Sequence, residues 1–286
     1  MRFVALRKFI YILSLLIIIP GLVSLCWPGR DALNYGIDFR GGSVMEVKFD
    51  QMVPSRDVRD VLAQFDLDKD AQIQRSGPNE MLIKTRDLSP NESISLKEAL
   101  QQNFSKIEVL RNDKVGPAFS KELTTKAVYS VLIACALTLI YISVRFEFNF
   151  GVGAIVALLH DVLIILGVFS LLRLEVDSSF VAAVLTVLGY SVMDTIVVFD
   201  RIRENMRQKE KDSYQTIVDS SIMQTLNRSV NTVLTVVICL VALLIFGGAA
   251  IKTFIIALLI GVISGCYSSI FVASPIWYDL KMREIN

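Results

Sequence analysis

Histidine is almost absent from this sequence: His160 is the only one in 286 residues. The segment 28–120 contains neither histidine nor cysteine, and it shows no catalytic constellation. The four cysteines of the chain lie in or beside apolar runs, without the spacing of a disulfide or metal site; they are Cys26, Cys135, Cys239 and Cys266. We therefore predict that the protein is not an enzyme and holds no metal or other cofactor.

An excess of charge of one sign is also lacking. The chain has 29 Lys and Arg residues against 28 Asp and Glu residues, which gives a formal net charge of +1. The basic residues do not alternate with aromatic residues in the pattern of a nucleic-acid surface. The composition therefore gives no reason to expect a nucleic-acid partner.

Long apolar runs are what the sequence has instead. Hydrophobic residues make up 53% of the chain, and the charged residues are concentrated between runs that are nearly free of charge. This distribution predicts an α-helical polytopic membrane protein with six transmembrane helices. The expected spans are residues 9–27, 123–144, 150–172, 180–199, 232–246 and 254–276.

The first apolar run follows basic residues, as a signal peptide would. It is longer than the roughly 7–15 residues of a signal-peptide core, and no small-residue cleavage site follows it. We therefore expect residues 1–27 to form an uncleaved first transmembrane helix, with a kink at Pro20 and Gly21.

Residues 28–120 have the composition of a small soluble domain. Period-2 alternation and turn residues predict four strands, at 44–49, around 73, at 81–85 and at 107–110. Helices are expected after Ser55, as an N-cap, and after Ser95, which has capping-box spacing with Glu98. The order β-α-β-β-α-β predicts a ferredoxin-like α+β domain between the first and second spans.

Lys and Arg are distributed unequally between the two sets of short loops. The set that includes both termini and the segment 200–224 is rich in them, whereas the opposite short loops carry only Arg173 and Lys252. By the positive-inside rule, both termini and a loop at about 200–224 are cytoplasmic, and the domain 28–120 is extracytoplasmic. The mixed charge of residues 200–224 predicts helical structure within this loop. Residues 121–286 then form a five-helix transmembrane domain.

A single acid, Asp194, interrupts the apolar span 180–199. A carboxylate in such a span costs roughly 2.5–3.5 kcal/mol on insertion scales, so we expect it to face protein or water. Thr186 and Tyr190 share its helix face at steps of four residues, and Ser191 lies beside that face.

The fifth span has a polar approach. Its apolar run is too short to cross a bilayer, so the helix must include Arg228, which shares a face with Gln224 and Asn231. We expect Arg228 to face Asp194 at similar depth. Two interpretations remain open: a structural pair or a snorkelling arginine, or a proton relay in which Arg228 holds Asp194 ionised until the helices separate.

Two other features of the spans are candidates for function or packing. His160 and Asp161 stand at the middle of the third span; a lone histidine is more often a packing residue, and Asp161 is a secondary candidate for proton transfer. Gly261 and Gly265 of the sixth span have small-xxx-small spacing, which favours close helix packing.

Five motifs in order resemble the SecD/SecF family of protein-export membrane proteins, from the SecF side. They are GIDFRGG at 36–42, ALLHDVLI at 157–164, GYSVMDTIVVFDRIREN at 189–205, SIMQTLNRSVNT at 221–232 and GVISGCYSSIFVASP at 261–275. The sequence departs from the family at Met193 and Met223, where Asn is usual. We hypothesise that an Asn–Asn contact of relatives is a Met–Met contact here.

The resemblance implies half of a resistance-nodulation-division-type bundle in the bacterial cytoplasmic (inner) membrane. Its implied partners are SecD, the SecYEG channel and the translocating preprotein, with YajC as a further candidate. Together with SecD it would use the proton-motive force, and no cofactor, to promote late steps of preprotein translocation.

The resemblance also selects residues. The implied proton pathway is Asp194 and Arg228, and the secondary candidates are Asp161, Tyr190, Ser191 and Thr195. The family signature comprises Gly36, Asp38, Arg40, Gly41 and Gly42. Two other functions stay open: a half-transporter of the same superfamily for lipid or small molecules, and a structural scaffold of the translocon.

Overall fold

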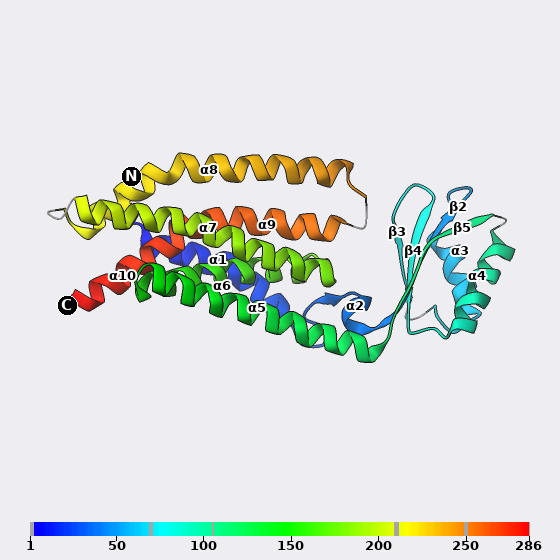
Figure 1. The fold of residues 1–286 in the computed structure, drawn as a ribbon. Coiled ribbons are helices and arrows are strands. Elements are labelled where there is room, and N and C mark those ends of the chain that lie inside the picture. The colour runs from blue at the N-terminus through cyan, green and yellow to red at the C-terminus, as the bar shows by residue number, and fades with distance from the viewer. Residues whose placement is uncertain (1–2, 69–70, 105, 209–211, 249–250, 286) are drawn as a thin grey trace. The chain divides into compact units, whose positions relative to one another are not determined.

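The computed structural model describes residues 3–68, 71–104, 106–208, 212–248 and 251–285 (Figure 1). The chain divides into two compact units. One comprises Met1–Asn34 together with Val128–Asn286, and the other comprises Tyr35–Ala127.

Among the described residues, six helical segments are long and apolar enough to cross a membrane, as predicted. They are α1 (Arg7–Leu25), α5 (Pro117–Arg145), α6 (Phe148–Leu171), α7 (Ser178–Gln208), α8 (Tyr214–Phe246), and the run formed by α9 (Lys252–Ser268), a π-helix (Ser269–Ala273) and α10 (Ser274–Ile285). Their apolar composition explains why they are helical throughout, because a backbone in hydrocarbon must satisfy its own hydrogen bonds.

The described part of the segment 200–224 is largely helix, in agreement with the helical structure that was expected there. α7 continues to Gln208 and α8 begins at Tyr214, after Ser213 caps it by accepting a hydrogen bond from the backbone N–H of Thr216. Alternating charges support the extension of α7, since Arg201 and Glu204 form an ion pair one turn apart.

Two glycines bring α1 and α6 into direct backbone contact. A Cβ atom added at Gly21 would lie 2.5 Å from Cα of Gly167, and one added at Gly167 would lie 2.9 Å from Cα of Gly21. Close to this crossing, the hydroxyls of Ser24 and Ser170 are hydrogen-bonded at 2.8 Å. Small residues thus allow the first helix to pack against the third, the usual device of membrane helices.

The chain just after α1 belongs to the membrane unit, and so the predicted boundary at residue 28 is too early. Arg30 Nη2 donates to Ser170 O at 3.2 Å, and Asn34 Nδ2 donates to Arg173 O at 3.1 Å. These bonds satisfy carbonyl groups at and just beyond the C-terminus of α6, which have no partner within the helix. Two short strands lie in these regions, β1 (Asn34–Tyr35) and β6 (Glu175–Val176).

The second unit contains a four-stranded sheet in the order β3-β4-β2-β5, with every neighbouring pair antiparallel. Its elements are α2 (Ile37–Arg40), β2 (Gly42–Phe49), α3 (Ser55–Ala63), β3 (Gln72–Arg75), β4 (Glu80–Thr85), α4 (Pro90–Asn103) and β5 (Ile107–Val115). Figure 1 shows α3 and α4 on the same side of the sheet. Val47, Leu62 and Leu100, from β2, α3 and α4, are fully buried in the core between them.

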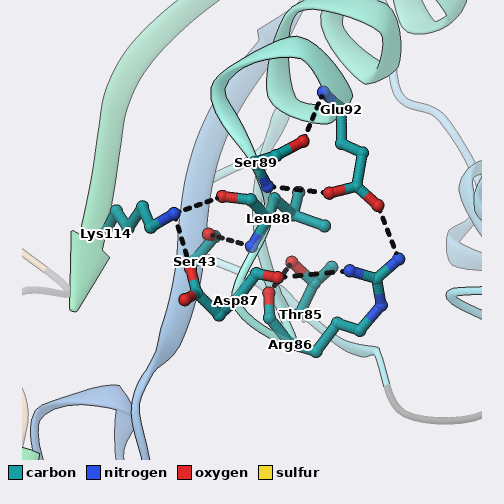
Figure 2. Close-up of polar contacts among 8 residues, drawn as sticks. All are labelled: Ser43, Thr85, Arg86, Asp87, Leu88, Ser89, Glu92 and Lys114. Carbon is teal, nitrogen blue, oxygen red and sulfur yellow. Dashed lines mark hydrogen bonds and ion pairs between the residues drawn. The ribbon is translucent and has the colours of Figure 1, made fainter. Parts of the chain in front are cut away.

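The helix caps of this unit differ from the predicted ones. α3 starts at Ser55 itself, so Ser55 is not its N-cap. The capping box of α4 is formed by Ser89 and Glu92 instead of Ser95 and Glu98 (Figure 2). The reason is Pro90, which is suited to the first helical position and therefore begins the helix earlier than the apolar pattern indicates.

Glu92 also connects the cap to Arg86. The hydrogen bond from Arg86 Nη2 to Glu92 Oε1, at 2.7 Å, is the main reason why the pKa of Glu92 falls to about 2, and the bond from the backbone N–H of Ser89 adds to it. A lowered folded-state pKa means that this carboxylate stabilises the unit above pH 4.5, its ordinary pKa, and that the contribution disappears as the pH falls towards 2.

Replacing Ser89 by Ala is expected to destabilise the second unit by about 1 kcal/mol, since a backbone N–H of α4 loses its acceptor. Ser95→Ala is the matched control and should have little effect.

Glu92→Gln should flatten the acid dependence of stability between pH 4.5 and about 2. Urea unfolding followed by circular dichroism across this pH range would test both; equal effects of the two serine substitutions would contradict the cap assignment.

Candidate functional site

One carboxylate inside the helix bundle joins three elements. Asp194 of α7 is half-buried, and its two oxygens accept hydrogen bonds from Ser229 Oγ of α8 and Ser269 Oγ of the π-helix, both at 2.6 Å. The carboxylate therefore faces protein, which lowers the cost of an acid within a span. Each oxygen has one hydroxyl donor among the described residues, and a carboxylate has about four acceptor positions, so Asp194 can bind a proton and keep both bonds.

Arg228 does not form the predicted ion pair with Asp194. Within the described part of the chain its side chain is exposed, and Ser229 occupies the position next to the acid. The buried face of α8 is the stripe that contains Ser221, Thr225 and Ser229. Successive helix residues are turned by about 100°, so a helix that directs Ser229 inward must direct Arg228 elsewhere.

The other predicted pathway residues of α7 do not contact Asp194 through hydrogen bonds. Ser191 Oγ donates to Asp161 Oδ2 at 2.8 Å, and Thr195 Oγ1 donates to the backbone oxygen of Ser191 at 3.0 Å. The hydroxyl of Tyr190 is buried and has no hydrogen-bond partner among the residues described. Of these three residues only Ser191 therefore bonds to a carboxylate, and that carboxylate is Asp161 and not Asp194.

The second carboxylate, Asp161 of α6, is completely buried and densely hydrogen-bonded. Its oxygens accept bonds from the hydroxyls of Ser191, Ser264 and Ser268, at 2.8, 2.6 and 2.8 Å respectively. Oδ1 also lies 3.1 Å from Nδ1 of His160. Asp161 thus connects α6, α7 and α9 at one point in the interior.

The consecutive residues Ser268 and Ser269 link the two acids, because the first binds Asp161 and the second binds Asp194. The π-helix begins at Ser269, and π-helical turns are frequent at functional sites. The two serines belong to the sequence motif at 261–275, but sequence reasoning gave them no role. It did not identify Ser229 and Ser264 as partners of the two acids. The only sequence signal for either residue is a hydroxyl group within an apolar span.

Gly261 and Gly265 lie where α9 packs against α7. A Cβ atom at Gly261 would be 2.3 Å from Val187 Cγ2, and one at Gly265 would be 3.2 Å from Ser191 Oγ. The absence of a side chain at residue 265 therefore leaves the space in which Ser191 reaches Asp161. Met193 and Met223 are 54% and 45% exposed, so neither is enclosed by this chain, and their contact stays a prediction.

The signature segment 36–42 begins the second unit. Gly36 is the N-cap of α2, which contains Asp38 and Arg40. Gly41 and Gly42 have φ values of +77° and +139°, and a Cβ atom at Gly42 would lie 2.5 Å from Thr85 O. The two glycines thus allow the chain to turn sharply into β2 and to approach β4 closely.

Two family descriptions match the chain. "Protein export membrane protein SecD/SecF, C-terminal" matches residues 95–283, and "SecD/SecF GG Motif" matches residues 32–51. The second match contains Gly41 and Gly42, whose φ values are positive. The first contains both carboxylates and all of their serine partners.

Curated relatives match over nearly the full length. "Protein translocase subunit SecF" of Thermobaculum terrenum is 42% identical, and the alignment covers 97% of this chain and 93% of that protein. The protein of the same name from Alicyclobacillus acidocaldarius is 40% identical, with coverage of 98% and 92%. The one from Haemophilus influenzae is also 40% identical, with coverage of 99% and 87%.

Solved structures resemble the whole chain. The crystal structure of SecDF from Thermus thermophilus, described as a translocon-associated membrane protein, superimposes with a TM-score of 0.90 at 36% identity. The match covers 99% of this chain but only 39% of that protein. A SecDF structure in a super-membrane-facing form gives a TM-score of 0.73 at 35% identity, again over 39% of its length.

Proposed function

Because this chain belongs to the SecD/SecF family of protein-export membrane proteins, we propose that it is an accessory subunit of the Sec translocase in the bacterial inner membrane. In this proposal it acts with SecD and uses the proton-motive force to promote late steps of preprotein translocation. The observation that carries the proposal is Asp194, an ionisable group that joins α7, α8 and the π-helix.

Protonation of Asp194 changes how firmly these elements are held together. Hydrogen bonds from Ser229 and Ser269 to an ionised carboxylate are charge-assisted, and such bonds are about twice as strong as neutral ones. Binding of a proton therefore weakens both contacts at once. A charge that crosses the membrane potential supplies about 2.3 kcal/mol per 100 mV, which is comparable to such a change.

Arg228 belongs to a second conformation in this proposal. It neighbours Ser229 on α8, so a turn of α8 by about 100° would exchange the hydroxyl for the guanidinium beside Asp194. An ionised Asp194 would then be paired, and a protonated one would be released from it. Tyr190, Ser191 and Thr195 keep secondary roles in the pathway, through packing and through Asp161.

SecD is the proposed partner within the membrane. Two helices, α5 and α8, have little of their apolar surface buried by this chain. α8 also exposes polar residues, among them Arg228 and Asn231, which a second membrane protein would cover better than lipid. The related SecDF chain is longer than this one, and a separate SecD would supply the remainder. We propose SecYEG, with YajC as a further candidate, as the assembly that this pair joins.

The second unit is proposed to be a ferredoxin-like domain on the extracytoplasmic side, where it would meet the emerging preprotein. The strand order β3-β4-β2-β5, with two helices on one face, supports this assignment of fold. The excess of Lys and Arg in the opposite loops supports the orientation, with both termini in the cytoplasm.

A reconstitution tests this function. The chain is placed in proteoliposomes with SecD and the translocase, and completion of translocation is measured with and without an imposed proton gradient. We expect stimulation that requires both this chain and the gradient, together with proton flux that depends on the preprotein. Equal stimulation after addition of an uncoupler would contradict the proposal and favour a structural scaffold.

A further inference from the structure

We propose that His160 is a second proton-carrying residue of the bundle and that Asp161 remains ionised as its counter-ion and orienting group. The protons that His160 carries are those of the proposed function, on which this inference rests. The juxtaposition behind it is a buried imidazole: one ring nitrogen lies against a densely hydrogen-bonded carboxylate, and the other has no hydrogen-bond partner among the described residues.

Asp161 has no acceptor position left for a proton. Oδ1 is contacted by His160 and Ser264, and Oδ2 by Ser191 and Ser268. Four donors saturate a carboxylate, whereas Asp194 has two. Protonation of Asp161 would either displace one of these donors inside a fully buried site, where a lost hydrogen bond costs about 1–3 kcal/mol, or move the hydrogen of His160 from Nδ1 to Nε2.

In this proposal the ionised carboxylate fixes the tautomer of His160. Nδ1 lies 3.1 Å from Oδ1 of Asp161, and an acceptor-only partner requires that Nδ1 carry the hydrogen. A proton can then bind or leave only at Nε2. When it binds, the lone pair of Nε2 forms the new N–H bond, and the positive charge of the imidazolium is balanced by Asp161.

The position of Nε2 supports exchange of a proton rather than a purely structural role. The His160 side chain is 5% exposed, and Nε2 is one of few buried side-chain atoms without a hydrogen-bond partner in the described chain. A structural histidine would bury this acceptor at a cost. An imidazolium would place a positive charge next to the buried, ionised Asp161 and so pair its charge.

The surroundings of the ring contain few other titratable groups. Tyr267 of α9 stacks on it with centroids 5.7 Å apart, and the Tyr267 hydroxyl is bonded to Ser14 of α1 at 3.0 Å. On α7, Ser191 binds Asp161, whereas Asp194 binds Ser229 and Ser269. Among the described contacts, Asp161 is thus the charged group that touches the His160 ring.

The single histidine makes the test direct. The chain, labelled with ¹⁵N-histidine and purified through a tag without histidine, is placed in lipid nanodiscs for NMR across a pH series. We expect Nδ1 to carry hydrogen at every pH and Nε2 to gain one as the pH falls. In Asp161→Asn the fixed tautomer should be lost, whereas Asp194→Asn should leave the titration of Nε2 in place. Loss of hydrogen from Nδ1, or a protonation state of Nε2 that never changes, would overturn the proposal.

A measurement of proton flux provides a second, independent test of the role of His160. His160→Asn keeps an N–H donor where Nδ1 stood but cannot carry a proton, and we expect gradient-driven proton flux with SecD to fall about tenfold or more. Unchanged flux in this variant, with flux still abolished by Asp194→Asn, would refute the role of His160 and leave the proposed function intact. An infrared carboxylic-acid band that disappears in Asp161→Asn would refute the ionised state of Asp161.

Discussion

Replacing Asp194 by Asn is expected to abolish gradient-driven proton flux and late translocation while the chain still folds and assembles. Asn has the same size, and its carbonyl oxygen can still accept from Ser229 or Ser269. It cannot bind and release a proton, so the stronger, charge-assisted state of the two contacts never forms. The flux should fall by about a hundredfold, towards background.

The measurement is proton uptake by proteoliposomes, read with a pH-sensitive dye during preprotein translocation. Asp200→Asn is the matched control, because Asp200 lies on the same helix and is exposed. The control should retain flux. If Asp194→Asn also retained it, with normal assembly, the site would be a structural contact and the protein a scaffold.

The second large effect is expected from Gly167→Ala, which should destabilise the membrane unit by about 1–3 kcal/mol or more. The new methyl group would lie 2.9 Å from Cα of Gly21, and a backbone atom cannot move aside as a flexible side chain can. α1 and α6 would have to separate, and the nearby bond between Ser24 and Ser170 would lengthen or break.

Gly189→Ala provides the control for the intrinsic effect of alanine. Gly189 is also helical, but no atom lies within 4 Å of the position that its Cβ would take. Alanine is a better helix former than glycine, so this variant should be neutral or slightly more stable. Thermal unfolding in nanodiscs, followed by circular dichroism, compares the two. A stable Gly167→Ala variant would show that the crossing of α1 and α6 adjusts without cost.

Hydropathy and alternation were sufficient for the six spans and for the strands of the four-stranded sheet, but not for the short elements α2, β1 and β6. The six spans follow from apolar runs, and the strands β2 and β4 follow from period-2 alternation, because both patterns report on a single element. The capping box shows the limit, since Ser89 and Ser95 both have the required spacing. Pro90, which a helix accepts at its start, was the signal that should have decided between them.

The environment of Asp194 could be predicted only in part. That an acid in a span faces protein follows from the cost of exposing it to lipid, and Ser229 and Ser269 are its partners. The expected pairing with Arg228 failed because α8 has two polar stripes, one through Arg228 and one through Ser229. Spacing defines both stripes, but the rotation of the helix is decided by tertiary packing, where the smaller serine fits. The contact of Gly21 with Gly167 was not foreseen, since the residues are distant in sequence.

The adjacency of Ser268 and Ser269 has a mechanical consequence. They are consecutive residues of one continuous helical segment, yet they bind acids on two different helices, Asp161 of α6 and Asp194 of α7. A shift of this helix that moves Ser269 away from Asp194 would therefore also move Ser268 relative to Asp161. The π-helix that starts at Ser269 would absorb the resulting strain. Asp194 and the pair of His160 and Asp161 could therefore be coupled mechanically, without direct transfer of a proton between them.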